Sequence, residues 1–269
     1  MNGKVTFVIP VRHPQNAKNW EENKRNIAET VKSISGQIGT NWSAVIVANE
    51  GAQLPPLPEG ILVKRVDFAP NPMHERNDAG VEAFYEAVRL DKGRRVLAGM
   101  LHVPDSEYFM IVDDDDFVSN KLAQFVASQR PANGWYINSG LVWSQGTKWV
   151  YTHDHFNEYC GTSYIVRADL MNLPASLEQA SDDYVKRMLG SHRFIVSDLQ
   201  SNNTPLAALP FAGAVYRIGH SGAHSKSNTV VRTFLLNRDN LRSPLKLIRS
   251  AARFRPLNAA IKKEFGLPE

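Results

Sequence analysis

The sequence predicts an α/β protein in which helices flank a mixed, mainly parallel sheet, followed by a basic helical tail. Short apolar runs alternate with amphipathic helical segments through the first 118 residues, a pattern typical of strand–helix–strand units. The connections are short, so each unit is expected to be right-handed and parallel. From Val230 onward nine basic residues stand against three acidic ones, which gives the tail +6 and the remaining body −2.

Composition limits the class of protein further. The 269 residues can form one large domain or two small ones. No apolar run approaches the roughly 18 residues of a membrane-spanning helix. The N-terminus enters a strand directly, which predicts no secretory signal, and the single Cys160 fits a reducing cytosol. These two features predict a cytoplasmic protein, either free or peripheral at the inner face of the membrane. Because the basic charge belongs to the tail, we expect no nucleic-acid partner.

The first half of the chain reads as a βαβαβ arrangement. Pro10 ends the opening strand, and apolar residues at helical spacing predict an amphipathic helix over 21–35. The Lys92-Gly93 pair predicts a break between two further helices. The expected strands are 4–10, 44–48, 61–66 and one that begins at 108, and the helices beside the break are 80–90 and 94–102.

The second half changes character. Aromatic segments at 135–143 and 148–152 surround Ser-Gln-Gly and predict a hairpin. Acidic residues suit the first turn of a short helix that opens at Ser181 and runs through Leu189. The other expected elements are a helix from about 120 to 129 and strands at 164–167, 194–196 and 214–218.

Four consecutive aspartates, Asp113 to Asp116, follow the strand that begins at 108. Clustered carboxylates repel one another, so such a site usually contains a cation. Hard oxygen ligands favour Mg²⁺, Mn²⁺ or Ca²⁺, and ligands bind at the carboxyl edge of open α/β sheets. The alternative is a solvated acidic turn in which Asp116 or Ser119 caps the next helix. Capping explains only one aspartate, so the sequence predicts a metal site.

Four motifs follow one another along roughly residues 4 to 226. They are the opening Phe-Val-Ile-Pro-Val strand, the D-x-D-D element at 113–116, the Ser181-Asp182-Asp183 helix start and the histidine-containing loop at 219–225. Together they resemble the GT-A nucleotide-sugar glycosyltransferases, and the chain is similar to family-2-like bacterial enzymes. The resemblance implies a GT-A, Rossmann-like catalytic domain over 1–228. Its nucleotide-binding half is 1–118, its acceptor-binding half is 119–228, and a basic amphipathic tail follows over 229–269.

The resemblance assigns the aspartates to metal and donor binding. Asp115 is expected to ligate the metal directly, and Asp113 to contact the ribose or to reach the metal through water. Asp114 or Asp116 supports either role, because four aspartates leave the register open. The metal would bridge the donor's diphosphate and stabilise the charge on the departing nucleoside diphosphate.

A late histidine, either His220 or His224, is expected to complete the metal sphere. Imidazole beside carboxylates favours Mn²⁺ over Mg²⁺. The resemblance also implies a UDP-sugar as donor and a glycan or lipid-linked saccharide as acceptor, in surface polysaccharide or lipopolysaccharide biosynthesis.

The catalytic base is expected at Asp183, which matches the second acidic position of the family's Glu-Asp element. It would take the proton from the acceptor hydroxyl in an inverting transfer. Asp182 stands in place of the usual glutamate and would orient the acceptor. The alternative is that both are helix-capping acids.

The nucleotide is expected near the end of the first strand, at Pro10, Val11 and Arg12, with Asn49 or Glu50 at the end of the second. Arg94 or Arg95 is expected to pair with the diphosphate, because guanidinium groups suit phosphate oxygens. The alternative for these two arginines is a solvated helix face.

The tail segment 243–265 mixes apolar residues with regularly spaced lysines and arginines. Such a segment can lie on an anionic membrane surface, and the competing interpretation is a helix packed on the body. Two rival functions remain: a non-catalytic nucleotide-sugar or glycan-binding module, and a sugar-phosphate nucleotidyltransferase. The latter needs a glycine-rich, arginine-bearing loop after the first strand, which 11–16 does not provide.

Overall fold

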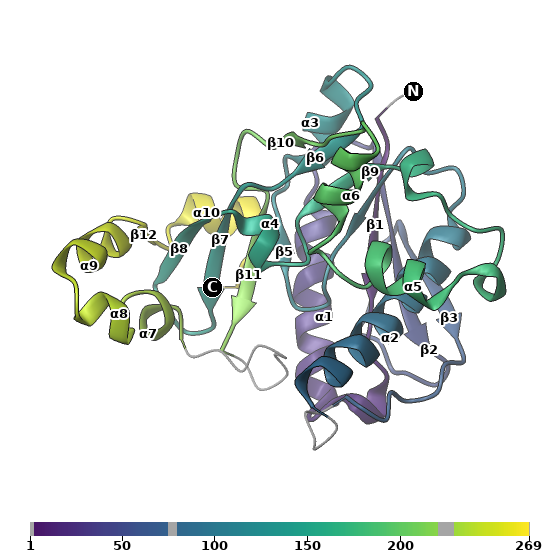
Figure 1. Cartoon of the computed structure of the whole chain (residues 1–269), viewed down its shortest axis with the longest axis horizontal. Coiled ribbons are helices and arrows are strands. Elements are labelled where there is room, and N and C mark those ends of the chain that lie inside the picture. Colours follow the sequence, from purple (N-terminus) through teal and green to yellow (C-terminus); the bar gives the residue numbers. More distant parts are fainter. Residues whose placement is uncertain (1–2, 75–79, 220–228, 269) are drawn as a thin grey trace.

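A computed structural model describes residues 3–74, 80–219 and 229–268, and these form a mixed α/β structure with two sheets (Figure 1). Helices flank the larger sheet, as the sequence predicts. The smaller sheet extends from it toward the C-terminal helices.

The larger sheet is mixed, with a parallel centre. Within the described residues, its parallel strands lie in the order β3-β2-β1-β4: β1 (Val5–Pro10), β2 (Trp42–Asn49), β3 (Ile61–Val66) and β4 (Tyr108–Ile111). Beyond β4 come β9 (Tyr164–Arg167), β6 (Gly134–Tyr136) and β10 (Ala207–Ala208), and β9 is antiparallel to both of its neighbours. This arrangement brings the carboxyl ends of β1 and β4 together.

Two long helices cover opposite faces of this sheet. Helix α1 (Trp20–Ser35) packs Ile27 and Val31 against one face of β1. Helix α2 (Val81–His102) packs Val96 and Leu97 against the other face. Alternate residues of a strand point to opposite faces, and every residue of β1 is buried, so the strand is covered on both sides.

The expected break at Lys92-Gly93 is wrong, since α2 is continuous through both residues. Gly93 lies where the π-helical segment η4 (Val185–Leu189) crosses α2, and a Cβ at this position would collide with the Val185 backbone. Glycine is therefore required by close packing, which outweighs its weak helix propensity.

The smaller sheet contains the expected hairpin. Its strands are β5 (Phe117–Val118), β7 (Ser139–Ser144), β8 (Trp149–Asp154), β11 (Ala214–Ile218) and β12 (Phe254–Pro256), in the order β12-β8-β7-β11-β5. The single strand expected over 135–143 is wrong, because β6 belongs to the larger sheet and β7 to the smaller one. The chain changes sheets at Ile137 and Asn138.

The strand expected over 194–196 is also wrong. These residues begin helix α6 (Ile195–Ser201), in which Ile195 and Leu199 are buried one turn apart on the α2 side of the sheet. The remaining short elements of the body are η1 (Pro14–Asn16), α3 (Leu122–Ser128), α4 (Phe156–Tyr159), η2 (Ala168–Met171), η3 (Leu177–Gln179) and α5 (Asp182–Tyr184).

The C-terminal segment contains α7 (Val230–Phe234), α8 (Arg238–Leu241), α9 (Pro244–Ala251), β12 and α10 (Ala259–Phe265). Strand β12 was not expected in a helical tail, and it pairs antiparallel with β8. Helix α10 anchors the segment, since Phe265 and Leu267 are buried in the same cluster as Phe117. Among the described residues, no helix is both long and apolar enough to cross a bilayer.

Candidate functional site

An open cavity of about 570 Å³ lies at the carboxyl ends of β1 and β4. Its lining includes Pro10, the last residue of β1, and the aspartates that follow β4. The cavity combines three kinds of side chain. These are carboxylates (Asp91, Asp113, Asp114, Asp115, Glu158), cations (Arg12, Arg89, Lys92, Arg95, Arg193) and tyrosines (Tyr85, Tyr159, Tyr216).

A tight turn arranges the four aspartates. The Asp116 backbone N–H donates to the Asp113 carbonyl at 3.1 Å, which closes the turn. Asp113, Asp114 and Asp115 line the cavity, whereas Asp116 is fully buried beneath them. This geometry separates the three aspartates that face the cavity from the one that does not.

Asp116 anchors the turn to the protein interior. Its carboxylate accepts hydrogen bonds from the Thr162 hydroxyl at 2.6 Å, the Arg217 backbone N–H at 3.2 Å and the Cys160 thiol at 3.3 Å. Burial, together with the charges of Asp115 and Asp113, raises the pKa of Asp116 well above its usual value. Asp116 therefore neither caps α3 nor faces the cavity.

Two residues of the 160–162 loop support this anchor. The Thr162 hydroxyl also accepts from the Asp113 backbone N–H at 3.0 Å, so it links both ends of the aspartate turn. Burial, and then the neighbouring Asp116 charge, raise the pKa of the Cys160 thiol well above its usual value. Cys160 is a protonated structural residue, as a lone buried cysteine usually is.

Lys92 of α2 forms an ion pair with the Asp113 carboxylate. Burial alone would lower the pKa of Lys92, but the charge of Asp113 reverses this and raises the pKa, so Lys92 stays charged. Gly161 lies against the pair, where a Cβ would be 2.8 Å from Asp113 Oδ2 and 2.9 Å from Lys92 Nζ. A side chain at position 161 would therefore displace the ends of Lys92 and Asp113 from their present places.

Arg95 has a different role from the one expected. Its guanidinium is 1 % exposed, donates twice to Asp91 at 2.9 and 3.1 Å, and donates to Asn49 Oδ1 at 2.6 Å. Asn49 in turn donates to the Phe68 carbonyl at 2.6 Å. Arg95, Asp91 and Asn49 thus form a hydrogen-bonded network that fixes the end of β2 to α2.

Aromatic side chains form another part of the lining. Tyr159 and Tyr216 meet edge to face with ring centroids 5.4 Å apart. The Tyr159 ring also stacks on the His153 ring, with centroids 4.6 Å apart. These contacts with His153 and Tyr216 hold the Tyr159 ring in place within the cavity lining.

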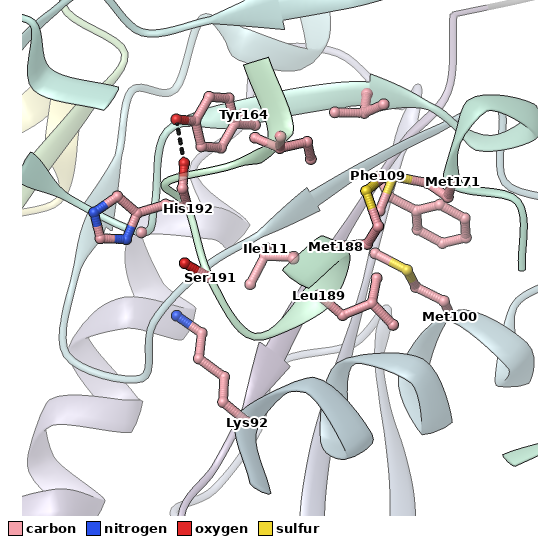
Figure 2. Close-up of a pocket in the computed structure, with 13 residues that line it drawn as sticks. Lys92, Met100, Phe109, Ile111, Tyr164, Met171, Met188, Leu189, Ser191 and His192 are labelled. Atoms are coloured by element: carbon pink, nitrogen blue, oxygen red, sulfur yellow. Dashed lines mark hydrogen bonds between the residues drawn. The ribbon is translucent and has the colours of Figure 1, made fainter. Parts of the chain in front are cut away.

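The 190–193 loop completes the cavity beside Lys92. His192 lies next to the Glu158 carbonyl (Nε2 to O, 3.2 Å), and its own carbonyl accepts from the Tyr164 hydroxyl at 2.7 Å. Burial, and then the charge of Lys92, lower the pKa of His192 to about 4, so it is neutral near pH 7. Figure 2 shows His192, Ser191 and Lys92 at one side of a small cavity whose opposite side is formed by methionines.

This small cavity has a volume of about 20 Å³ and lies behind the main one. Its lining is mostly apolar and includes Met100, Met171 and Met188. A space of this size holds at most about one water molecule, so it is a packing gap and not a substrate site.

The structure brings together some of the residues expected from the sequence. Pro10, Arg12, Asp113, Asp114 and Asp115 all line the main cavity. Val11 is fully buried, Asn49 joins the Arg95 network, and Glu50 is exposed just after β2. His220 and His224 lie outside the described residues, so the expected histidine ligand is untested.

The expected catalytic acids lie elsewhere. Asp182 pairs with Arg94 at 3.1 Å, and both line a separate hollow of about 300 Å³ beside Phe68. Asp183 contributes to the electrostatic surroundings of Lys186 and Arg187, which follow it along the chain. Neither acid lines the cavity that holds the aspartate turn.

Sequence reasoning missed several residues of the cavity, notably Lys92, Tyr159, Gly161 and His192. Only the Gly161-Thr162-Ser163 run gave a local signal, as a small, polar turn before a strand. The others reach the cavity through tertiary packing of α2, α4 and the 190–193 loop.

The donor set suits a divalent cation that also binds a substrate phosphate. Such ions often take only one or two protein carboxylates and complete their sphere with water and phosphate oxygens. In the described ranges, no three or more His, Cys, Asp or Glu side chains form a ready-made metal group. Asp113 and Asp115 nevertheless provide two carboxylates in one cavity that also holds cations for the phosphates.

Comparisons with known proteins do not assign the chain to a family. A scan against family models finds no match, and a search of curated proteins finds no relative.

Proposed function

We propose that this protein is a metal-dependent glycosyltransferase that binds a nucleoside-diphosphate sugar in the 570 Å³ cavity. The observation that carries the proposal is the meeting of Asp113 and Asp115 with Lys92 and Arg12 in one open cavity. Carboxylates with cations suit a diphosphate bridged by a divalent ion. UDP is the expected nucleotide, and a glycan or lipid-linked saccharide is the expected acceptor.

The topology supports the same proposal. From β1 the chain passes through α1 to β2 on one side, and from β3 it returns through α2 to β4 on the other side. Neighbouring strands β1 and β4 therefore mark the point where strand order reverses. Ligands of open α/β sheets bind at this point. A parallel β3-β2-β1-β4 core followed by antiparallel β9 is compatible with the GT-A fold that the motifs suggest.

The chain's own residues would neutralise a departing nucleoside diphosphate. Asp115 and Asp113 would hold a Mn²⁺ or Mg²⁺ ion, which supplies Lewis-acid stabilisation of the leaving group when bound. Lys92 and Arg12 would contact the same phosphate oxygens. Lys92 is held next to Asp113 before any ligand arrives, so its positive charge is already positioned.

The acceptor hydroxyl needs a base, and the cavity offers Glu158. Its side chain is 75 % exposed and lines the cavity beside Tyr159 and His192. Asp91 is engaged by two hydrogen bonds from Arg95, which leaves Glu158 as the cavity carboxylate outside the aspartate turn best suited to take a proton. We therefore assign the base to Glu158 in preference to Asp183.

One observation favours a second candidate, a nucleotide-sugar or glycan-binding module without catalysis. Lys92 neutralises Asp113 directly. A diphosphate bound by Lys92 and the arginines without a metal would then be held but not activated. The nucleotidyltransferase alternative gains no support, because β1 leads into the short η1 helix and 11–16 contains no glycine.

Turnover separates these candidates. The purified chain would be incubated with a panel of UDP-sugars, and release of UDP measured with Mn²⁺ and with a chelator. Mn²⁺-dependent release that an added saccharide acceptor stimulates supports the transferase. Tight nucleotide-sugar binding without turnover under any metal condition favours the binding module.

A further inference from the structure

Large apolar side chains are exposed in the part of the tail formed by α8 and α9. Leu241 is 62 %, Leu245 70 % and Ile248 64 % exposed. Figure 1 shows α7, α8 and α9 together at the end of the molecule opposite β3. Exposed clusters of large apolar residues commonly mark an interaction surface.

Helix α9 has one side that packs against the protein and another that is exposed to solvent. Its inner side faces α7, where the Ser250 hydroxyl donates to the Phe234 carbonyl and Leu247 is half-buried. Leu245 and Ile248, three residues apart, share a side that points away from the body. The apolar stripe is therefore solvent-exposed, which the sequence pattern alone could not show.

Positive charge lies directly beside this stripe. Lys246 and Arg249 are exposed and share the neighbouring side of α9, and Arg242 is exposed just before the helix. Asp239 is the only acidic residue between 229 and 263. We call Leu241, Leu245, Ile248, Arg242, Lys246 and Arg249 together the α8–α9 surface.

The C-terminal part of the basic segment packs on the body, which is the competing interpretation given for 243–265. Helix α10 packs on the body through Phe265, and the Glu264 carboxylate accepts from Ser119 and Lys121 at 2.8 Å. The segment 243–265 thus divides into a docked half and an exposed half.

We propose that the α8–α9 surface binds an anionic lipid bilayer. Exposed apolar side chains next to a cationic stripe are the pattern of helices that lie in a membrane interface, where the leucines enter the headgroup boundary and the cations pair with lipid phosphates. A symmetric contact with a second copy would instead bring these cations against one another. The inference does not depend on the transferase proposal, because no residue of the α8–α9 surface lines the cavity.

Vesicle sedimentation with the full chain tests the proposal. The vesicles would contain phosphatidylcholine alone or mixed with phosphatidylglycerol. One variant replaces the apolar stripe (Leu245→Ser with Ile248→Ser), and another replaces the cations (Lys246→Gln with Arg249→Gln). Matched controls at other exposed positions are Leu62→Ser in β3, and Lys18→Gln with Lys32→Gln.

The wild-type chain and both controls should bind the anionic vesicles selectively, and binding should weaken as salt rises. Loss of two cations should weaken binding roughly thirtyfold, because each contributes about fivefold near an anionic surface. The apolar variant should lose on the order of tenfold or more.

Equal binding to both vesicle types, or equal behaviour of the variants and their controls, would overturn the proposal. So would a lipid-free dimer, seen by analytical ultracentrifugation, that dissociates in the Leu245→Ser/Ile248→Ser variant. Loss of vesicle binding with UDP-sugar turnover intact would separate the membrane surface from the catalytic site.

Discussion

Lys92 and Asp113 form an ion pair that joins helix α2 to the turn after β4, within the lining of the 570 Å³ cavity. The pair places a cation beside the carboxylate that we propose as a metal ligand. Lys92 should therefore affect metal binding at Asp113, and Asp113 should affect phosphate binding at Lys92. A phosphate gains an adjacent positive charge, whereas a bare metal ion must compete with the lysine for Asp113.

Replacement of Lys92 should therefore have opposite effects on two ligands. In Lys92→Met, UDP should bind roughly 10- to 100-fold more weakly in the presence of Mn²⁺, because a charge-assisted hydrogen bond is lost. Mn²⁺ alone should bind more tightly, because Asp113 loses its protein counter-charge. Isothermal calorimetry measures the first change and electron paramagnetic resonance titration the second. Lys92→Arg is the charge-preserving control, and a fall in both affinities would contradict this role.

The two candidate bases can be compared directly. Glu158→Gln should reduce transfer roughly 100- to 10,000-fold while UDP-sugar binding stays intact, because a neutral amide cannot accept the proton. Asp183→Asn should retain most of the activity, since Asp183 does not line the cavity. Steady-state transfer and donor binding would be measured for both. The reverse pattern would restore Asp183 as base.

The lowered pKa of His192 predicts that the stability of the folded protein depends on pH. Burial favours its neutral form, so the folded protein takes up this proton only near pH 4, whereas the unfolded chain takes it up near the ordinary value of 6.5. Protonation therefore favours unfolding, and stability from this group is present above pH 6.5 and lost as the pH falls toward 4. The Tm of the wild type should fall more steeply across this window than that of His192→Gln. Parallel Tm profiles for the two proteins would exclude the effect.

The tail should contribute to the stability of the body. Phe265 is 2 % exposed in the cluster with Phe117, so Phe265→Ala should lower the free energy of unfolding by about 3–5 kcal/mol. Leu245→Ala, in the exposed half of the same segment, should change it by less than about 0.5 kcal/mol. Urea denaturation measures both. Similar small effects would mean that α10 is not part of the core.

The sequence predicted the parts of the fold that depend on local pattern. Strand β3 has the expected ends, and β1 begins one residue later than expected, because proline, glycine or polar residues bound both segments. The wrong predictions fall at segments whose secondary structure is determined by tertiary packing. Gly93 permits contact with Val185 inside a continuous helix, and the β-prone Phe194 to Val196 run joins a helix because Ile195 and Leu199 are buried together.

The sequence predicted where the site lies but not how its side chains are arranged. Four aspartates after a buried strand indicated the carboxyl edge, but their register required the structure, which turns Asp116 inward onto Thr162. Lys92 has no local signal, because it meets Asp113 only through the packing of α2 beside β4. Arg95 matched the expectation for a phosphate ligand in residue type, yet its burial and its bonds to Asp91 show an internal role.

Calorimetric titration of wild type and Asp115→Ala with UDP, with and without Mn²⁺, tests whether the aspartate turn forms a metal-dependent nucleotide site. We expect Mn²⁺-dependent UDP binding to the wild type and a loss of affinity on the order of 100-fold in Asp115→Ala. The control Asp105→Ala, which removes an exposed aspartate just before β4, should bind like the wild type. UDP binding that neither requires the metal nor changes in Asp115→Ala would contradict a metal-dependent site at the aspartate turn.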